Sequence, residues 1–388
     1  MKISFYSNFL NHHQLPFCKE MYETLGDDFK FIATEPVPEE RLIMGYHDMS
    51  TMYPFSLNTY SSKEDYKRAI ELGDNSDIVI IGSAPKLFIE SRLKSNKLTF
   101  YYSERIFKSG RWKVFSPRGF VSLMKNHTRY RKNNLYMLCA SAYTAADFSL
   151  VGAYRDKTYK WGYFPEVKDH DLSILMKQKK HNDTPKLLWV GRFLDWKHPD
   201  DALKLALMLK KNKYRFSLDI IGTGPMESEL KRIIQKNNLE DDVKLLGSMK
   251  PEEVRLRMEM ANIFLFTSDY NEGWGAVLNE SMNSGCAVVA SHAIGSVPFL
   301  MENNKNGLIY KNGDINHLYE NVKHLIDNEK ECTRLGINAY DTLKNTWNAK
   351  LVAHRFIKLC ESLSKGEKTP YVDGPCSKAE IISQRYKY

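Results

Sequence analysis

The sequence predicts an α/β protein built from two Rossmann-like, doubly wound parallel sheets. Short runs rich in β-branched and aromatic residues alternate with helix-like stretches along most of the chain, which is the pattern of repeated strand–helix–strand units. The alternation lapses between Pro165 and Lys186, where the composition turns polar and charged, as is typical of a domain boundary. We therefore expect one sheet on each side of that segment.

The individual elements follow from the same pattern. Runs of β-branched and aromatic residues predict strands of the first half at 2–6, 29–33, 78–82, 98–102 and 136–140. Strands of the second half are expected at 187–190, 217–221, 243–246, 263–266, 287–290 and 308–310. Helices are expected between them at 201–211, 225–237, 251–260, 275–284 and 315–328, and an amphipathic stretch predicts a last helix at 349–363.

Composition excludes several classes of protein. A chain of 388 residues with 43% hydrophobic residues is ordinary for a folded globular protein. Its six cysteines are widely spaced without a CxxC pair, which argues against a disulfide framework or a zinc ribbon. The opening "MKISFYSNFLNHHQ" lacks the long apolar segment expected of a secretory signal, and no run approaches the roughly 18 apolar residues of a membrane span. We expect a cytoplasmic protein.

The formal net charge of +9 is unevenly distributed. No acidic residue lies between Glu104 and Asp147, and the same interval is rich in cations mixed with apolar residues. Such a segment suits the inner face of an anionic membrane, at about 1 kcal/mol per cation, or is a solvated basic face. Nucleic acid is a weaker interpretation, because base-reading motifs are missing. The cations are Arg105, Lys108, Arg111, Lys113, Arg118, Lys125, Arg129, Arg131 and Lys132.

Two cations follow the first strand of the second half. Arg192 and Lys197 stand in "GRFLDWKHPDD", just before a helix that Pro199 helps to begin. Cations beside a helix N-terminus suit a phosphate or diphosphate. The alternative is a pair of surface cations bridged to Asp195 or Asp200.

Two glycines follow the next expected strand, 217–221. Gly222 and Gly224 in "IIGTGPMESEL" allow a tight turn, and Pro225 suits the first position of a helix. Glu227 stands where a dinucleotide fingerprint needs a small residue, so a nicotinamide or flavin cofactor is not supported. The turn is equally compatible with a plain strand-to-helix link.

The segment "NEGWGAVLNESMNSG" follows the fourth strand of the second half. Gly273 and Gly275 permit close backbone approach, and the amides around Trp274 open a helix, which favours an anion. Glu272 beside that turn would suit sugar hydroxyls or a developing positive charge. The alternatives are a helix-start carboxylate for Glu272 and an exposed helical residue for Glu280.

Together these segments resemble the family 4 glycosyltransferases of the GT-B fold. The resemblance covers about 185–345 and rests on "WVGRFLDWKHPDDAL", "DIIGTGPMESEL", "VKLLGSMKPEEV", "NIFLFTSDYNEGWGAVLNESMNSGCAVVAS" and "NGLIYKNGD". It implies an acceptor-binding domain at 1–170, a nucleotide-sugar-binding domain at 171–350, and a helix at 351–388 that returns to the first domain and ends in a polar tail.

The resemblance also implies roles for single residues. Arg192 and Lys197 would clamp the donor diphosphate, Glu272 would contact the transferred sugar, and Glu280 would contact the ribose. The amides around Trp274 and Gly275 would meet phosphate or sugar, and Ser248 and Met249 would lie near the base. The family retains anomeric configuration without a metal or a protein nucleophile, so no cofactor is expected.

The first half departs from the family pattern. Asn11, His12 and His13 occupy the turn where many relatives carry a glycine-rich loop, and Glu104 or Arg105 stands where relatives often place a histidine. These five residues are the candidates for acceptor or cleft contacts.

A metal-dependent alternative rests on "DHD" at 169–171, a spacing that another glycosyltransferase fold uses to hold Mn²⁺ or Mg²⁺. It falls in the polar segment and not at a strand end. We therefore expect a retaining, metal-independent enzyme that moves a sugar from a nucleotide-sugar to a saccharide or lipid-linked saccharide in surface polysaccharide synthesis. A GT-B nucleotide-sugar epimerase and a catalytically silent nucleotide-sugar-binding protein are the alternatives.

Overall fold

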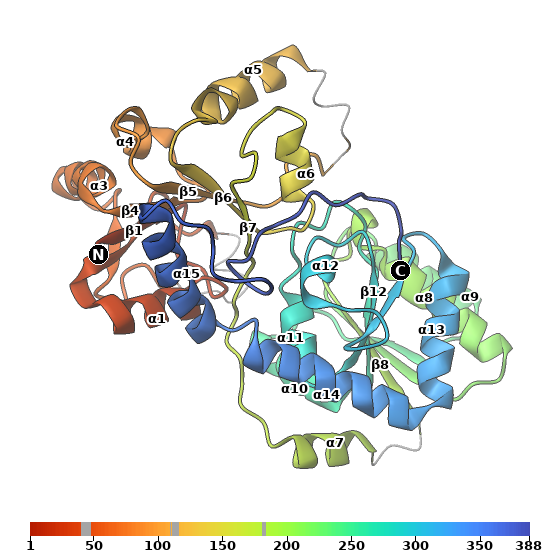
Figure 1. Cartoon of the computed structure of the whole chain (residues 1–388). Helices are drawn as coiled ribbons and strands as arrows, with labels where there is room; N and C mark the ends of the chain where they lie inside the picture. The colour runs from red at the N-terminus through yellow and green to blue at the C-terminus, as the bar shows by residue number, and fades with distance from the viewer. Residues whose placement is uncertain (40–47, 109, 111–115, 181–183) are drawn as a thin grey trace. The chain divides into compact units, whose positions relative to one another are not determined.

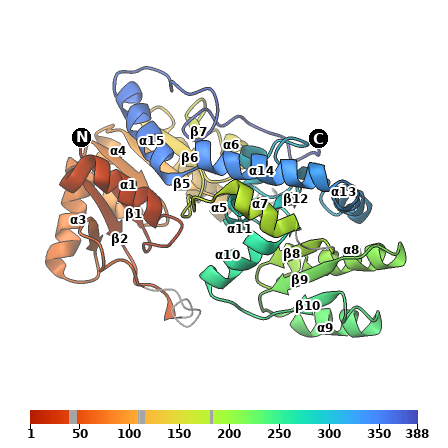
Figure 2. The same cartoon turned by 90° about the horizontal axis from the view of Figure 1, so that it is seen from below.

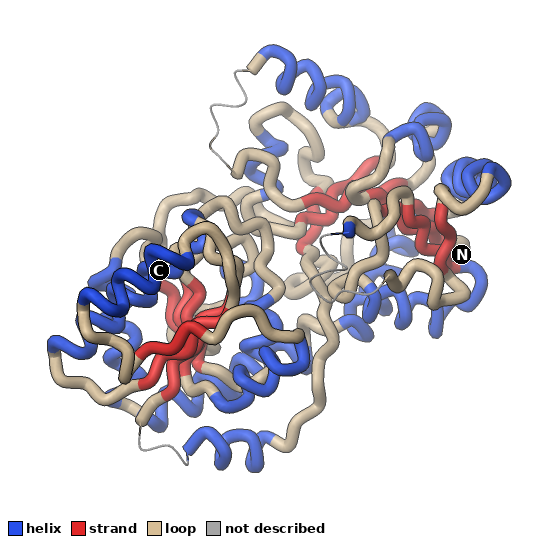
Figure 3. The backbone as a smooth tube through the Cα atoms, turned by 180° about the vertical axis from the view of Figure 1, so that it is seen from behind, coloured by secondary structure: helices blue, strands red, loops and turns tan. Residues whose placement is uncertain are grey.

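The computed structural model describes residues 1–39, 48–108, 110, 116–180 and 184–388 (Figure 1). The chain divides into two compact units. The first consists of Met1–Glu166 and Asn348–Ser383, and the second of Val167–Trp347 and Gln384–Tyr388. Figure 3 shows the strands gathered into two groups with helices around each.

The first unit contains a seven-stranded parallel sheet in the order β3-β2-β1-β4-β5-β6-β7. All five predicted strands are confirmed within one residue. The sequence did not predict β3 and β7, whose three residues, Ser-Leu-Asn and Thr-Tyr-Lys, contain a single hydrophobic side chain each. The strands are β1 (Ile3–Ser7), β2 (Phe29–Ala33), β3 (Ser56–Asn58), β4 (Ile78–Ile81), β5 (Thr99–Ser103), β6 (Leu135–Cys139) and β7 (Thr158–Lys160).

Helices of the first unit come from both of its chain segments. The last helix, α15 (Ala349–Ser364), packs in this unit, and its Phe356 ring lies 6.2 Å from Phe17 and 5.1 Å from Phe100. Beyond it, Lys378 forms an antiparallel bridge with Tyr159 of β7. The other helices are α1 (Leu15–Leu25), α3 (Lys63–Asn75), α4 (Glu90–Lys94), α5 (Pro117–Asn126) and α6 (Thr144–Ser149), with short 3-10 turns at Gly26–Asp28, Lys86–Ile89 and Thr128–Tyr130.

The second unit contains a six-stranded parallel sheet in the order β10-β9-β8-β11-β12-β13. Its predicted strands are confirmed within one residue. The strands are β8 (Lys186–Val190), β9 (Ser217–Ile221), β10 (Val243–Leu245), β11 (Ile263–Phe266), β12 (Ala287–Ser291) and β13 (Leu308–Tyr310). The doubly wound α/β fold expected from the sequence is thus present in both units.

Helices cover the second sheet and bury its apolar side chains. One core cluster joins side chains of α8, α9 and α13 to those of the strands, and Figure 2 shows α8 and α9 beside β8, β9 and β10. The predicted helices are confirmed within two residues. The helices are α7 (Leu172–Lys180), α8 (Pro199–Lys211), α9 (Glu227–Lys236), α10 (Pro251–Met260), α11 (Val277–Asn283), α12 (Val297–Leu300), α13 (Ile315–Asp327) and α14 (Glu329–Asn345), with a 3-10 turn at Asp195–Lys197.

The polar segment between the two halves is more ordered than its composition suggests. Helix α7 lies inside it and buries Leu175 and Met176. Its Lys179 is also buried, and the ammonium donates to the carbonyl oxygens of Met258, at 3.0 Å, and Ala261. Lys179 occupies a buried position of the helix, but as a charged residue it interrupts the apolar pattern by which a helix is recognised in the sequence. The helix was therefore not predicted.

The cysteines and the apolar helices bear on two expectations drawn from the composition. All six cysteines are buried and unbridged, as expected of small core side chains. Within the described part of the chain, no helix combines the length and apolar character needed to cross a membrane.

Candidate functional site

A partly buried ion pair lies where the strand order of the second sheet reverses. Strand β8 has β9 on one side and β11 on the other, which makes the β8/β11 boundary the topological switch point, where ligands of such sheets bind. Lys197 follows β8 and Glu272 follows β11, and the ammonium lies 2.5 Å from Oε2 of the carboxylate. Glu272 is only 8% exposed, and Ser268 donates to the same oxygen at 3.1 Å.

Other hydrogen bonds fix the backbone on which Lys197 stands. The Thr267 hydroxyl lies 2.7 Å from the carbonyl oxygen of Lys197 and 2.9 Å from that of His198. The Trp189 indole donates to the same hydroxyl at 2.8 Å, and the amide of Asp269 donates to the carbonyl of Trp196 at 3.0 Å. These hydrogen bonds hold the turn after β8 against the loop after β11 independently of the ion pair.

His198 connects the same two segments. Its backbone is left-handed, with φ of 48°, and its Nε2 lies 3.5 Å from Oδ2 of Asp269. This pairing with Asp269 raises the pKa of His198 above its ordinary value. Four residues of this network were not predicted from the sequence, although all lie within the motif segments quoted above: Thr267, Ser268, His198 and Asp269.

Arg192 differs from Lys197 in its surroundings. It is exposed in the same turn, and among the described residues its guanidinium forms no hydrogen bond or ion pair. The alternative of cations bridged to Asp195 or Asp200 does not describe Lys197, because its ammonium pairs with Glu272 while Asp200 pairs with Lys204 at 2.7 Å.

Gly222 and Gly224 allow two turns to touch. A Cβ on Gly222, whose φ is 138°, would lie 1.9 Å from the carbonyl oxygen of Gly191, and one on Gly224 would lie 2.7 Å from that of Phe193. The amide of Phe193 donates to Thr223 at 2.8 Å across this contact. These glycines bring the turn after β9 against the turn that carries Arg192 and Lys197.

The loop that carries Glu272 is shaped by a third close contact. Gly275 has φ of 79°, and a Cβ there would lie 2.3 Å from the Phe266 ring. Gly273 is buried, and Trp274 is fully buried with its indole donating to Asn279 at 2.9 Å. The Trp274 side chain therefore serves the core, which leaves only its backbone for the role expected of this turn.

The remaining candidates of the second unit lie farther along the sheet edge. Glu280 is half-buried on α11. Burial raises the pKa of its carboxyl above the ordinary value, and the nearby charge of Arg255 opposes part of this shift. Ser248 and Met249 follow β10, the edge strand, and Ser248 is exposed. Within the described residues, no hydrogen bond joins these three side chains to Lys197 or Glu272.

The candidates of the first unit fall into two groups. The Asn11 side chain accepts from the amides of His13 and Gln14, at 3.0 and 3.1 Å, which shapes the turn after β1. The His13 ring stacks on Tyr163 with centroids 5.4 Å apart and lies 3.7 Å from the His12 ring. Tyr163 in turn donates to Glu104 at 2.6 Å. Asn11, the two histidines and Glu104 therefore belong to one connected group.

Arg105 belongs instead to the core of the first unit. It is 3% exposed, and its guanidinium lies 3.2 Å from the buried Asp147 carboxylate. The amides of Ile106 and Phe107 donate to the other oxygen of Asp147. This corrects the expectation of an accessible Arg105, because the first acidic residue after the basic interval is its partner.

The "DHD" residues already have structural partners. Asp169 accepts from Tyr340 at 3.1 Å and pairs with Lys344. Asp171 accepts from the amides of Ser173 and Ile174 at the start of α7. The two carboxylates thus take part in an ion pair and in capping the start of α7.

Comparison with known proteins places these features in context. Residues 173–342 match the model of the family described as "Glycosyl transferases group 1". The chain is 29% identical over 184 residues to the amylovoran biosynthesis glycosyltransferase AmsK of Erwinia amylovora, covering 46% of this chain and 45% of that protein. It is 25% identical over 185 residues to the poly(ribitol-phosphate) alpha-N-acetylglucosaminyltransferase of Staphylococcus aureus, covering 47% of this chain and 37% of that protein.

A solved structure extends the likeness to both units. HepE of Anabaena, solved in complex with UDP, aligns with a TM-score of 0.68 at 15% identity, covering 94% of this chain and all of that one. The chain thus spans less than half the length of the two curated relatives above but the full length of this structural neighbour. The GT-B fold expected from the sequence is confirmed, and the match of 173–342 to a glycosyltransferase family model agrees with the resemblance found in the sequence.

The contact between the turns after β8 and β9 yields a stability prediction. Gly222→Ala should destabilise the second unit by about 3 kcal/mol or more, because the new Cβ meets the Gly191 carbonyl and the backbone is left-handed. Thermal unfolding followed by circular dichroism measures the change.

A matched control separates the two causes. Gly313 also has a left-handed φ, of 75°, but an added Cβ there would meet nothing within 4 Å. Gly313→Ala should therefore cost only about 1 kcal/mol. Equal losses in the two variants would show that close approach of the turns is unimportant.

Proposed function

We propose that this chain, in which residues 173–342 form a group 1 glycosyltransferase domain, is a retaining, metal-independent enzyme that transfers a sugar from a nucleotide-sugar to an acceptor. The observation that carries the proposal is the partly buried ion pair of Lys197 and Glu272 at the switch point of the second sheet. The acceptor is a saccharide or a lipid-linked saccharide, and the pathway is surface polysaccharide synthesis.

Lys197 and Arg192 would serve the leaving group. When a sugar–phosphate bond breaks, negative charge grows on the departing nucleoside diphosphate, and fixed cations stabilise that charge without reorganisation. The Lys197 ammonium is held beside the switch point by its backbone contacts with Thr267. Arg192 is exposed in the same turn, so its guanidinium can approach a phosphate from the solvent side.

Glu272 would serve the sugar. Its carboxylate balances the Lys197 charge in this structure and retains further acceptor capacity, since an ionised carboxylate can accept several hydrogen bonds. Sugar hydroxyls are suitable donors for it. A negative charge at this place also matches the positive charge that develops on a sugar ring as its bond to phosphate lengthens.

The similar proteins suggest the class of donor and acceptor. HepE was solved with UDP, and AmsK is named for the synthesis of a polysaccharide. We therefore propose a UDP-sugar as the first donor to test. Glu280 and the 248–249 segment are the candidates for ribose and base, while Asn11, His12, His13 and Glu104 are the candidates for acceptor contacts.

Nucleotide binding gives the first test. Thermal unfolding is measured with UDP, GDP, ADP, CMP and dTDP, and one of them should raise Tm, because a ligand at 100 times its Kd stabilises by about 2.7 kcal/mol. Transfer of radiolabelled sugar from the best donor then follows, with and without acceptor. Absence of stabilisation by all five would contradict the proposal, and a change of sugar without acceptor would indicate an epimerase.

Substitutions in the ion pair test the roles of its members. Lys197→Met and Glu272→Gln should each lower kcat/KM for transfer by roughly 10² to 10³, the loss typical of removing one transition-state contact. Lys204→Met and Glu227→Gln are matched controls, because both residues form exposed ion pairs on nearby helices. Wild-type transfer by the Glu272 variant would remove the sugar-contact role.

Helix α5 supports a peripheral contact with an anionic membrane. None of its residues is buried, and Phe120 and Val121 are 38% and 62% exposed beside the exposed cations Arg118 and Lys125. An exposed helix with both basic and apolar residues is typical of interfacial binding. Arg111 and Lys113, which belong to the same basic interval, lie outside the described residues.

Charge reversal on this surface provides the test. Combined Arg118→Glu, Lys125→Glu and Arg129→Glu should weaken binding to vesicles of anionic phospholipid by roughly a hundredfold, at about 1 kcal/mol per cation removed. The control reverses three exposed cations of α3, Lys63, Lys67 and Arg68. If both triple variants bind as the wild type does, the membrane contact is contradicted.

A further inference from the structure

The last five residues of the chain, Gln384–Tyr388, form a strap on the second unit. They belong to this unit, whereas the preceding Asn348–Ser383 belongs to the first. The Tyr386 hydroxyl donates to the carbonyl of Ile309 on β13 at 3.2 Å. Its ring lies edge-on to His292 and to His317, with centroids 5.2 and 5.5 Å away. The strap and the loops beneath it line an open pocket of about 410 Å³.

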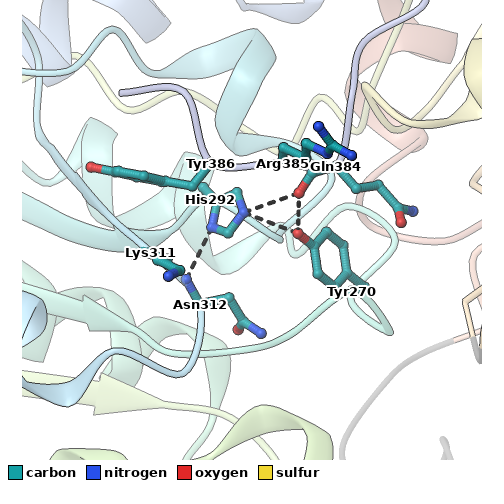
Figure 4. A pocket seen from close by; sticks show the side chains of 7 residues that line it. All are labelled: Tyr270, His292, Lys311, Asn312, Gln384, Arg385 and Tyr386. Atoms are coloured by element: carbon teal, nitrogen blue, oxygen red, sulfur yellow. Dashed lines mark hydrogen bonds between the residues drawn. The ribbon is translucent and has the colours of Figure 1, made fainter.

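A hydrogen-bonded cluster of Tyr270, His292 and Gln384 joins the strap to the sheet edge (Figure 4). The Tyr270 hydroxyl bonds to the Gln384 carbonyl and lies 2.9 Å from His292 Nε2. The amide of Asn312 donates to His292 Nδ1 at 3.0 Å. Nδ1 is therefore the acceptor and Nε2 carries the proton, which leaves Tyr270 free to direct its own proton to the strap.

This cluster is continuous with the Glu272 loop. Tyr270 stands two positions before Glu272, and the amide of Glu272 donates to the Asp269 carbonyl at 3.1 Å, which closes a tight turn around Tyr270. On the other side, Gly295, three positions after His292, donates its amide to the Glu272 carbonyl at 3.3 Å. The backbone amide and carbonyl of Glu272 thus each bond to a residue close in the chain to one that the strap contacts, Tyr270 in one case and His292 in the other.

We propose that the strap is a positioning element that fixes the Glu272 loop through Tyr270 and His292. Like the roles of Lys197 and Glu272, this inference rests on the proposed transfer activity. The strap joins loops that follow three neighbouring strands, because Tyr270 follows β11, His292 follows β12 and Asn312 follows β13. Its described hydrogen bonds go to Tyr270, His292 and Ile309, on the side of the sheet formed by β11, β12 and β13. Its loss should therefore affect the sugar end of the site more than nucleotide binding.

Two variants test the strap. One ends the chain after Ser383, and the other, Tyr270→Phe, removes only the hydroxyl. Both should lower kcat for transfer by roughly tenfold, the effect of one lost hydrogen bond on the placement of a catalytic group. The KM for the donor and the Kd for UDP should stay within about twofold. Tyr214→Phe is the control, because it removes a hydroxyl of the same unit that bonds to Asp327, at 3.2 Å.

Hydrogen exchange provides a readout that does not need activity. In both variants the amides of 268–273 should exchange roughly tenfold faster than in the wild type, because local opening becomes easier. Those of α9 should be unchanged. This measurement separates the two proposals, since faster exchange without transfer by any donor would support the strap and contradict the enzyme.

Three outcomes would overturn the strap as a positioning element. Unchanged exchange at 268–273 after truncation would show that the loop is fixed without it. A rise in turnover after truncation would show an inhibitory lid. A loss of UDP affinity equal to the loss of kcat would show general damage to the fold.

Discussion

Lys197 and Glu272 meet across the switch point of the second sheet although 75 residues separate them in the chain. Removing a cation and a carboxylate from water is costly, and their attraction repays that cost only when the geometry is well fixed. Here the geometry is fixed by neighbours: Thr267 holds the backbone of Lys197, and Ser268 holds the carboxylate. The contact between the turns after β8 and β9 and the strap against the loop after β11 extend the same arrangement outward.

Much of the fold could be predicted because burial leaves a strong pattern in the sequence. The central strands are covered on both faces, so they read as continuous apolar runs, and their ends were placed within one residue. β3 and β7 carry no such run, since each has one hydrophobic side chain among three residues. α7 was hidden for a different reason, since its buried Lys179 finds its partners in carbonyl groups about 80 residues away in the chain.

The sequence indicated which residues are candidates for the site, but not which of them form ion pairs with one another. The residues after each strand end indicated a diphosphate and a sugar, yet nothing local shows that Lys197 meets Glu272 and not Asp200. That choice depends on β8 lying next to β11, which is a property of strand order. Arg105 shows the same limit, because its buried partner Asp147 is distant in sequence. The glycines mark turns in the sequence, but which backbone they approach depends on the neighbouring turn that the fold places beside them.

The final segment of the chain determines how the second unit can be exchanged between related proteins. Residues 376–379 are bonded to β7 of the first unit, and Gln384–Tyr388 pack on the second. A chimera that exchanges the second unit at Glu166 and Trp347 alone would therefore pair a foreign sheet with a native strap. Tyr270 and His292 on one side and Gln384 and Tyr386 on the other must change as a set. A chimera that transfers the second unit from a relative therefore needs three junctions, after Glu166, Trp347 and Ser383, instead of two.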